Sequence, residues 1–405
     1  MQSWGRVATN GKVNAGTARK VYVIDSGVAD HADFRDANGL NDTVTRTNVA
    51  CGTSWQCQLV DPTQYPVVGC YAHATHVAGI IGAHANNDKT SAGVYAGVKM
   101  VSVAVTSRTF DAPPGNCGNS SGPQAVVFDP NGVVNSRIGY ALDYVYWDTA
   151  NNGGALVSIV NISMNGGAMG WLPSGSTWVS ENNYSKVRKL ATPAYYVNNY
   201  GYSSYYQGAF VAQSAGNLGA NACGYTTNPT YGTQYFNAYN SGAGFVPGYP
   251  PQWTAVDYDG IMVVGAIHHT GVPVTAAFPF SGTYPAGLSG TPTASNYGAC
   301  VDVWAPGNVI VSTWGLHVAF PANAQTVAGV SPPYSGNVLS GTQGWAFLSG
   351  TSMAAPHVAG AAAYLADQFG LTSPAAIEAK VRQQMVQYNG NTDAAGLDVR
   401  MVQLP

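Results

Sequence analysis

Apolar residues gather in short, nearly unbroken runs along the chain, and the densest is Lys20-Val-Tyr-Val-Ile-Asp25. A β-branched run of this kind predicts a strand buried on both faces of a sheet. Other runs predict strands at 99–104, 155–163, 208–214, 261–265 and, shorter, 300–304. Patterns typical of helices cover 73–83, 133–151, 352–367 and 373–384.

Strands that alternate with helices along a whole chain indicate βαβ units. We therefore predict an α/β fold, with a doubly wound, mostly parallel sheet covered by helices on both faces. No charged or Gly/Ser-rich linker divides the sequence, so 1–405 is expected to form one domain. The segments near 171–206, 225–256 and 314–345 are interpreted as surface insertions.

The composition narrows the class of protein. Of 405 residues, 46% are hydrophobic, which is enough for a large core, and only 9% are charged. The formal net charge of -3 offers no basic excess to neutralise phosphates, so nucleic-acid binding is not expected. A surface solvated by uncharged polar side chains suits an extracellular protein.

Two further features bear on the compartment. No apolar stretch reaches the roughly 20 residues that a membrane span needs, and the first residues contain no apolar signal-peptide core. We expect a secreted protein whose targeting segment has been removed. The six cysteines contain no CxxC pair, which argues against zinc; three disulfides are favoured over six buried thiols.

Ser352 lies in the segment Gly350-Thr-Ser-Met-Ala-Ala-Pro-His-Val-Ala-Gly360, where a Gly-Thr turn enters a predicted helix. A hydroxyl at a helix N-terminus lies beside free backbone N–H groups, which favour a developing anion. The alternative is an ordinary helix N-cap serine.

His73 and His76 share one helix face in His73-Ala-Thr-His-Val-Ala-Gly79. The helical zinc motif has i,i+4 spacing and a glutamate, and both features are absent here. His73 is therefore interpreted as a catalytic imidazole with His76 packed behind it. The alternative is a satisfied core histidine.

Asp25 ends the first predicted strand, at the sheet edge where active sites of open α/β folds gather. Alone, it could cap the following Ser-Gly turn. Together, Asp25, His73 and Ser352 have the residue types of a nucleophilic triad: a carboxylate orients an imidazole, which takes the hydroxyl proton.

At this point the chain resembles the subtilisin-like serine proteases, or subtilases. The matching motifs are Val23-Ile-Asp-Ser-Gly27, His73-Ala-Thr-His-Val-Ala-Gly79, Ala215-Gly-Asn217 and Gly350-Thr-Ser-Met-Ala-Ala-Pro-His357. The likeness spans residues 20 to about 368 and is strongest to the proteinase K and aqualysin branch. It implies the three-layer subtilisin-like fold.

The resemblance also implies roles for site residues. Asp25, His73 and Ser352 would be the triad, and Asn217 would donate to the oxyanion. Substrate would pair with an edge formed by Ser163, Met164, Asn165 and Gly166, beside a pocket lined by Ala215 and Gly216. Asn165 stands where the family keeps glycine, which leaves subsite specificity open, and Ala74 replaces another glycine.

Structural features follow from the same resemblance. It implies disulfides Cys70–Cys117 and Cys223–Cys300, with Cys51–Cys57 left by subtraction. It also implies a structural calcium ion held by Gln2, Asp33 and a loop that contains Asn86, since oxygen ligands suit calcium. Catalysis itself is expected to need no cofactor.

We predict a secreted serine endopeptidase that acts on proteins or peptides through an acyl-enzyme. It is expected to be a monomer that has lost a pro-segment. The alternatives are a processing peptidase of narrow specificity and an inactive binding protein with the subtilase fold.

Overall fold

The computed structural model describes residues 3–14, 16–40, 42–51, 57–60, 72–85, 91–105, 133–151, 156–163, 190–191, 207–217, 219, 222, 258–279, 294–314 and 344–405. The architecture below is that of these residues. No helix among them is long and apolar enough to cross a membrane.

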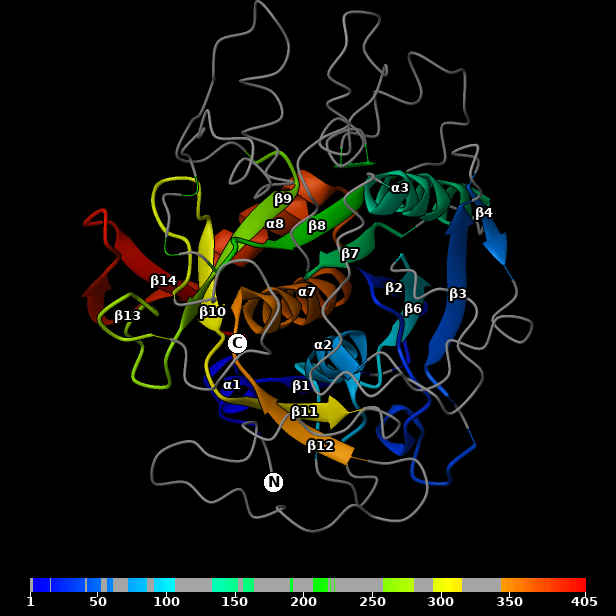
Figure 1. Cartoon of the computed structure of the whole chain (residues 1–405), viewed down its shortest axis with the longest axis horizontal. Helices are drawn as coiled ribbons and strands as arrows, with labels where there is room; N and C mark the ends of the chain where they lie inside the picture. Colours follow the sequence, from blue (N-terminus) through cyan, green and yellow to red (C-terminus); the bar gives the residue numbers. More distant parts are fainter. Residues whose placement is uncertain are drawn as a thin grey trace, which may run out of the picture.

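A ten-stranded sheet forms the centre of the described part (Figure 1). Every neighbouring pair from β14 through β3 is parallel, and only the two edge pairs, β13 with β14 and β3 with β4, are antiparallel. In spatial order the strands are β13 (Met385–Thr392), β14 (Asp398–Val402), β10 (Val303–Pro306), β9 (Ile261–Ile267), β8 (Ala209–Ser214), β7 (Ser158–Ile162), β2 (Lys20–Asp25), β6 (Lys99–Ala104), β3 (Val44–Cys51) and β4 (Cys57–Val60).

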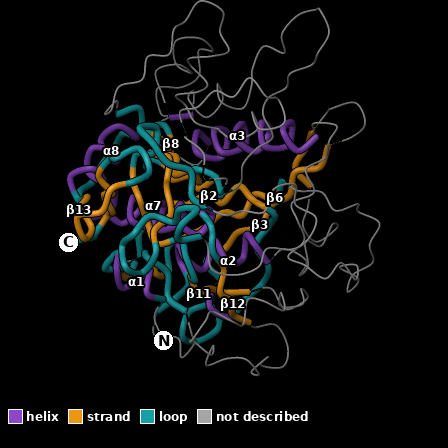
Figure 2. The backbone as a smooth tube through the Cα atoms, turned by 60° about the vertical axis from the view of Figure 1, so that its left-hand side comes forward, coloured by secondary structure: helices purple, strands orange, loops and turns teal. Residues whose placement is uncertain are grey.

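Helices cover both faces of this sheet (Figures 1 and 2). On one face lie α2 (Ala72–Gly82), α7 (Thr351–Gln368) and α8 (Pro374–Gln383), and on the other lies α3 (Val133–Asn151). Alternate residues of β2 point to opposite faces. Val21 and Val23 belong to the hydrophobic core beside α2, α7 and α8, while Tyr22 and Ile24 belong to the core beside α3. The predicted three-layer α/β fold is confirmed.

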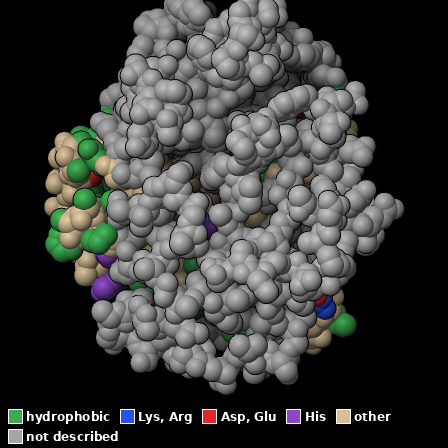
Figure 3. Space-filling model, viewed as in Figure 1, with side chains coloured by type: hydrophobic (Ala, Val, Ile, Leu, Met, Phe, Trp, Pro, Cys, Tyr) green, Lys and Arg blue, Asp and Glu red, His purple; other side chains and the backbone are tan. Residues whose placement is uncertain are grey.

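Smaller elements surround this body. They are α1 (Trp4–Ala8), η1 (Ala32–Phe34), the parallel pair β1 (Lys12–Val13) and β5 (Tyr95–Ala96), and the antiparallel pair β11 (Ile310–Trp314) and β12 (Gly344–Leu348). At the edge formed by β13 and β14, hydrophobic side chains reach the surface (Figure 3); Val386 there is 40% exposed.

Helix α2 packs tightly against β11. A Cβ added at Gly79 would lie 2.2 Å from Ser312 Oγ and 2.3 Å from Thr313 Oγ1, so only glycine permits this approach. The same two hydroxyls donate to helix carbonyls: Ser312 Oγ to His76 O at 2.7 Å and Thr313 Oγ1 to Thr75 O at 2.6 Å. Strand β11 therefore fixes the helix that contains His73 through contacts at Thr75, His76 and Gly79.

Every predicted helix and strand lies within a few residues of an observed one, whereas β3, β4, β13 and β14 of the main sheet were not predicted. The strand predicted at 300–304 is instead Val303–Pro306, because Cys300 lies in a turn closed by Val301 N–H donating to Gly298 O. Leu190 and Ala191, within the predicted insertion 171–206, are buried with α3, so this part is not a surface element.

The other predicted insertions are described only in part. Both ends of 314–345 belong to the β11–β12 pair, with Trp314 fully buried. The predicted insertion therefore begins and ends in this strand pair. The segment 225–256 lies outside the described residues.

Candidate active site

The predicted site residues collect at the carboxyl ends of three adjacent strands. Asp25 ends β2, Ser163 follows β7, and Ala215 to Asn217 follow β8. After β2 the chain forms β3, β4 and β6 on one side of that strand and then β7, β8, β9 and β10 on the other, so β2 lies at the topological switch point of the sheet. Ligands of open α/β sheets bind at such points.

Asp25 and His73 form a hydrogen-bonded pair. His73 Nδ1 lies 2.9 Å from Asp25 Oδ1 and 3.0 Å from Oδ2. The Asp25 side chain is fully buried, and its Oδ1 also accepts from Ser26 N–H at 2.6 Å. An ionised carboxylate can only accept, so Nδ1 carries the proton and neutral His73 presents Nε2 as a base.

The environment of His73 suits proton transfer. Burial lowers its pKa, but the negative charge of Asp25 and the hydrogen bond to it outweigh burial, so the pKa is raised above the ordinary 6.5. Its side chain remains 27% exposed. An imidazole that is accessible and stabilised as the cation can take a proton from a nucleophile and return it.

His76, one turn further along α2, has a different role. It is fully buried, and its Nε2 lies 2.9 Å from the carbonyl oxygen of Ile310 in β11. His76 is therefore a buried histidine that joins α2 to β11.

Ser352 is the second residue of α7, after Gly350 at the N-cap. Gly350 has φ 154°, a value that residues with side chains rarely adopt. The Ser352 hydroxyl donates to Ser163 O at 2.8 Å, and the Ser163 hydroxyl donates back to Ser352 O at 2.8 Å. Within the part of the chain described, Ser352 makes no hydrogen bond to His73.

Strand register nevertheless brings the two halves of the site together. Ile24 pairs with Ile162, so the following residues, Asp25 and Ser163, end neighbouring strands. Such strands lie about 4.8 Å apart. Ser352, bonded twice to Ser163, therefore lies one strand away from the carboxylate that holds His73.

Asn217 is fixed to the start of α7. Its Oδ1 accepts from both Thr351 N–H and Thr351 Oγ1 at 2.8 Å. Because a backbone N–H can only donate, the amide oxygen must face Thr351, which leaves the Nδ2 hydrogens for another acceptor. Asn217 is thus anchored to the residue that precedes Ser352.

The predicted substrate edge is described only at Ser163, since Met164, Asn165 and Gly166 lie outside the described residues. Ala215 and Gly216 are buried, and both of their carbonyls are held by Asn296, through its Nδ2 at 2.7 Å and its backbone N–H at 2.8 Å. The sequence alone did not indicate this role for Asn296, which lies in the stretch Ser295-Asn-Tyr-Gly298.

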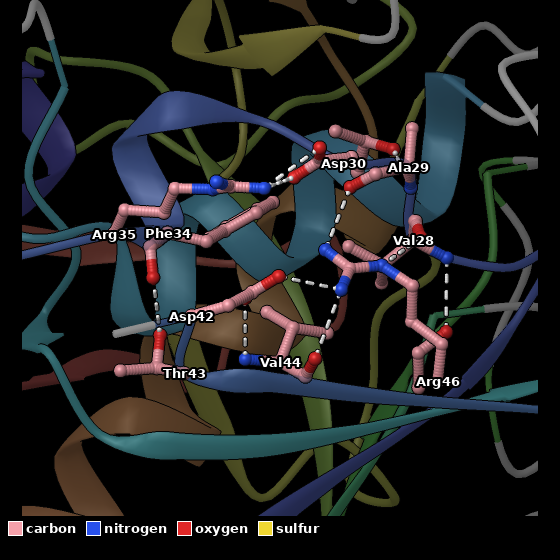
Figure 4. A network of polar contacts seen from close by, with 11 residues as sticks. Val28, Ala29, Asp30, Phe34, Arg35, Asp42, Thr43, Val44 and Arg46 are labelled. Atoms are coloured by element: carbon pink, nitrogen blue, oxygen red, sulfur yellow. Dashed lines mark hydrogen bonds and ion pairs between the residues drawn. The ribbon is translucent and has the colours of Figure 1, made fainter. Parts of the chain in front are cut away.

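A polar network secures the segment that leaves Asp25 (Figure 4). Arg46 donates through Nε to Val28 O at 2.9 Å and through Nη1 to Asp42 Oδ2 at 2.7 Å. Ala29 N–H donates to Thr75 Oγ1 of α2 at 2.9 Å. The network therefore ties the end of β2 to the helix that carries His73.

Asp33, the described member of the predicted calcium ligands, is fully buried. Its Oδ2 accepts from Ser91 N–H at 3.2 Å, Ser91 Oγ at 2.6 Å and Trp345 Nε1 at 2.7 Å. Its Oδ1 is buried and has no hydrogen-bond partner within the described part of the chain. Gln2 and Asn86 lie outside the described residues, and no group of three or more His, Cys, Asp or Glu suited to a metal occurs in the described part.

The cysteine pairing is described in part. Cys51 and Cys57 are directly opposite each other in the β3–β4 register, which places their Cα atoms close enough for a disulfide. Cys300 is disulfide-bonded and packs against Ala222, the residue before Cys223. Cys70, Cys117 and Cys223 lie outside the described residues.

The profile of the subtilase family matches residues 16–397. A doubly wound sheet that gathers Asp25, His73 and Ser352 at its switch point agrees with this match. The chain belongs to the subtilase family.

Individual relatives are similar over shorter stretches or at lower identity. A 90-residue segment, 22% of this chain, is 41% identical to Subtilisin-like protease 2 of Trichophyton equinum, Trichophyton rubrum and Arthroderma otae. The match spans 16% of each of those relatives. A solved cold adapted subtilisin-like serine proteinase is 20% identical, with 99% of this chain and 97% of that chain covered and a TM-score of 0.49.

Proposed function

We propose that the protein is a secreted serine endopeptidase that hydrolyses peptide bonds through an acyl-enzyme on Ser352. The observation that carries this proposal is the Asp25–His73 pair beside a serine at the N-terminus of α7. Membership of the subtilase family supports the same reaction class.

In the proposed reaction, the Ser352 hydroxyl turns from Ser163 O toward His73 Nε2. Its proton passes to Nε2 as its oxygen bonds to the substrate carbonyl carbon, and the carbonyl electrons move to the oxygen. The Asn217 amide and the backbone N–H of Ser352 would stabilise that oxyanion.

Collapse of the tetrahedral species breaks the C–N bond, and His73 gives its proton to the leaving amine. Water then attacks the ester, loses a proton to His73, and Ser352 leaves with that proton restored. Asp25 holds the imidazole in one tautomer throughout and stays ionised.

A substrate would bind along the Ser163–Gly166 edge, as an added strand. Ser163 O already accepts a hydrogen bond from Ser352. A substrate N–H that takes over this carbonyl would free the nucleophile. Ala215 and Gly216 would lie beside the residue that precedes the scissile bond.

Covalent labelling tests the proposal. A fluorophosphonate probe should modify Ser352 in the folded protein, located by mass spectrometry, and should not modify heat-unfolded protein. Labelling is specific for an activated serine, so unlabelled Ser352 in folded protein would exclude the proposed activity.

A structural calcium ion is a separate proposal. The buried, unpartnered Oδ1 of Asp33 supports it, since calcium prefers oxygen ligands. Gln2 and Asn86 would complete the site. Chelation should lower the melting temperature of wild type, and Asp33→Asn should abolish that chelator effect; equal chelator effects in both would contradict the site.

Compartment and association are also proposed. Low charge supports an extracellular location, and among the described cysteines none is free. The protein would act as a monomer on protein or peptide substrates after loss of a pro-segment.

A further inference from the structure

The carbonyl of Ser352 is deprived of its usual helical partner. In an α-helix the carbonyl of residue i accepts from the N–H of residue i+4, which here is Pro356, inside α7. Proline has no N–H, and its ring crowds the carbonyl four residues earlier. The backbone of the proposed nucleophile therefore needs a hydrogen bond from outside the helix.

Ser163 supplies that bond. Its hydroxyl lies 2.8 Å from Ser352 O, and Ser163 is 1% exposed, so water does not compete for this contact. A carbonyl oxygen can only accept, so the single hydroxyl proton of Ser163 is committed to Ser352.

Asn161 fixes the direction of that proton. Its Nδ2 lies 2.9 Å from Ser163 Oγ. Since the Ser163 proton points to Ser352, Asn161 must present its donor end to Ser163. Asn161 is fully buried in β7, and its Oδ1 has no hydrogen-bond partner among the residues that the structure describes. Leaving a buried acceptor unsatisfied is unfavourable, which calls for a compensating role.

We infer that Asn161 and Ser163 are positioning residues, whose relay of donors replaces the missing Pro356 N–H and fixes the backbone of Ser352. This inference rests on the proposed function of Ser352. Two bonds join Ser163 and Ser352, and only one involves the Ser352 hydroxyl. The side chain can therefore turn toward His73 while the relay bond holds the backbone in place.

The test compares second-order rates of fluorophosphonate labelling and kcat and KM for a peptide, on the plateau of the pH profile. Ser163→Ala removes the donor but leaves the Ser163 carbonyl available to substrate. It should lower labelling and kcat roughly 10- to 100-fold with KM little changed, the scale expected for a misplaced reacting group. Ser163→Thr, which keeps a hydroxyl, should restore most of the rate.

The matched control is Ser158→Ala. Ser158 is a buried serine at the other end of the same strand, 2.8 Å from Thr149 Oγ1, and its loss should leave both rates near wild type. If Ser163→Ala does not fold, Asn161→Asp is the second variant. Its carboxylate would draw the Ser163 proton away from Ser352 and lower kcat in the same way.

A double variant tests whether the missing N–H of Pro356 is the reason that Ser352 needs the Ser163 hydroxyl. Pro356→Ala restores an N–H that can donate to Ser352 O, so Ser163→Ala should cost much less in that background. An equal loss with and without Pro356 would overturn the relay, as would labelling of Ser163→Ala at the wild-type rate. Absence of labelling in wild type would instead reject the proposed function.

Discussion

The two faces of the sheet are packed in different ways. The core beside α3 is built from large side chains, such as Ile138, Leu142 and Tyr146. The core beside α7 is lined largely by alanine, including Ala354, Ala355 and Ala359. Small side chains allow a helix to approach its neighbours closely, so the α7 face has little room to shift.

This difference coincides with the candidate site. His73 comes from α2 and Ser352 from α7, both in the first turn, whereas no predicted site residue comes from α3. Close packing and side-chain hydrogen bonds to the backbone fix the helices that contain His73 and Ser352. We therefore expect changes on either face to lower stability, and only changes on the α2 and α7 face to alter turnover.

The largest effect among the partners of the nucleophile is expected at Asp25. Asp25→Asn keeps the shape of the buried side chain, but its amide can donate to His73 Nδ1 and so favours the wrong tautomer. We expect kcat to fall by about 10⁴-fold. Steady-state kinetics with a thermal melt as the folding control would measure this. A folded variant within tenfold of wild type would exclude Asp25 from the triad.

Asn217 should show a smaller loss. As an oxyanion donor, its replacement in Asn217→Ala should lower kcat by about 10²–10³-fold with KM little changed. As a mere anchor of Thr351, it would affect stability and leave the turnover of the folded fraction unchanged. Kinetics normalised to the titrated active fraction distinguish these outcomes.

A pair of core variants compares the two faces directly. Gly79→Ala places a methyl 2.2 Å from Ser312 Oγ and should cost about 1–3 kcal/mol. Leu142→Ala leaves a cavity under α3 and should cost about 2–5 kcal/mol. Urea unfolding would give both stabilities. Only Gly79→Ala should also change kcat. A wild-type kcat in that variant would contradict the expected difference between the two faces of the sheet.

The free energy of unfolding should change gradually with pH as His357 and Glu378 titrate. Burial lowers the pKa of His357 in α7 to about 4, so its stabilising contribution is present above pH 6.5 and is lost as pH falls toward 4. Burial, only partly offset by Arg382, raises the pKa of Glu378 in α8 to about 7. Its contribution is present below pH 4.5 and is lost as pH rises toward 7.

Two substitutions separate these contributions. His357→Gln should flatten the fall in unfolding free energy on the acid side, and Glu378→Gln should flatten the fall toward neutral pH. Urea unfolding across this pH range measures both. Profiles parallel to wild type would show that neither group couples to folding.

The sequence predicted most reliably what depends on local pattern. The buried β-branched run 20–25 is β2, residue for residue, and the helix 133–151 is α3. The motif residues Asp25, His73 and Ser352 do gather at one edge of the sheet. Each of these follows from composition within a short window or from a family motif.

Long-range polar contacts could not be predicted in the same way. The bond from Trp345 to Asp33 joins residues 312 positions apart, and the bonds between Ser163 and Ser352 span 189. Strand β13 was missed because its sequence, Met-Val-Gln-Tyr-Asn-Gly-Asn-Thr, is mostly polar at a sheet edge. Only its partner β14 makes it a strand.

The proposed mechanism depends above all on Ser352 as the nucleophile. The most direct measurement is peptide turnover by Ser352→Ala, with the fold checked by thermal melt. Removal of the nucleophile should lower kcat by about 10⁶-fold while the melting temperature stays near that of wild type. Turnover at the wild-type rate in the folded variant would contradict the assignment of Ser352 and, with it, the proposed mechanism.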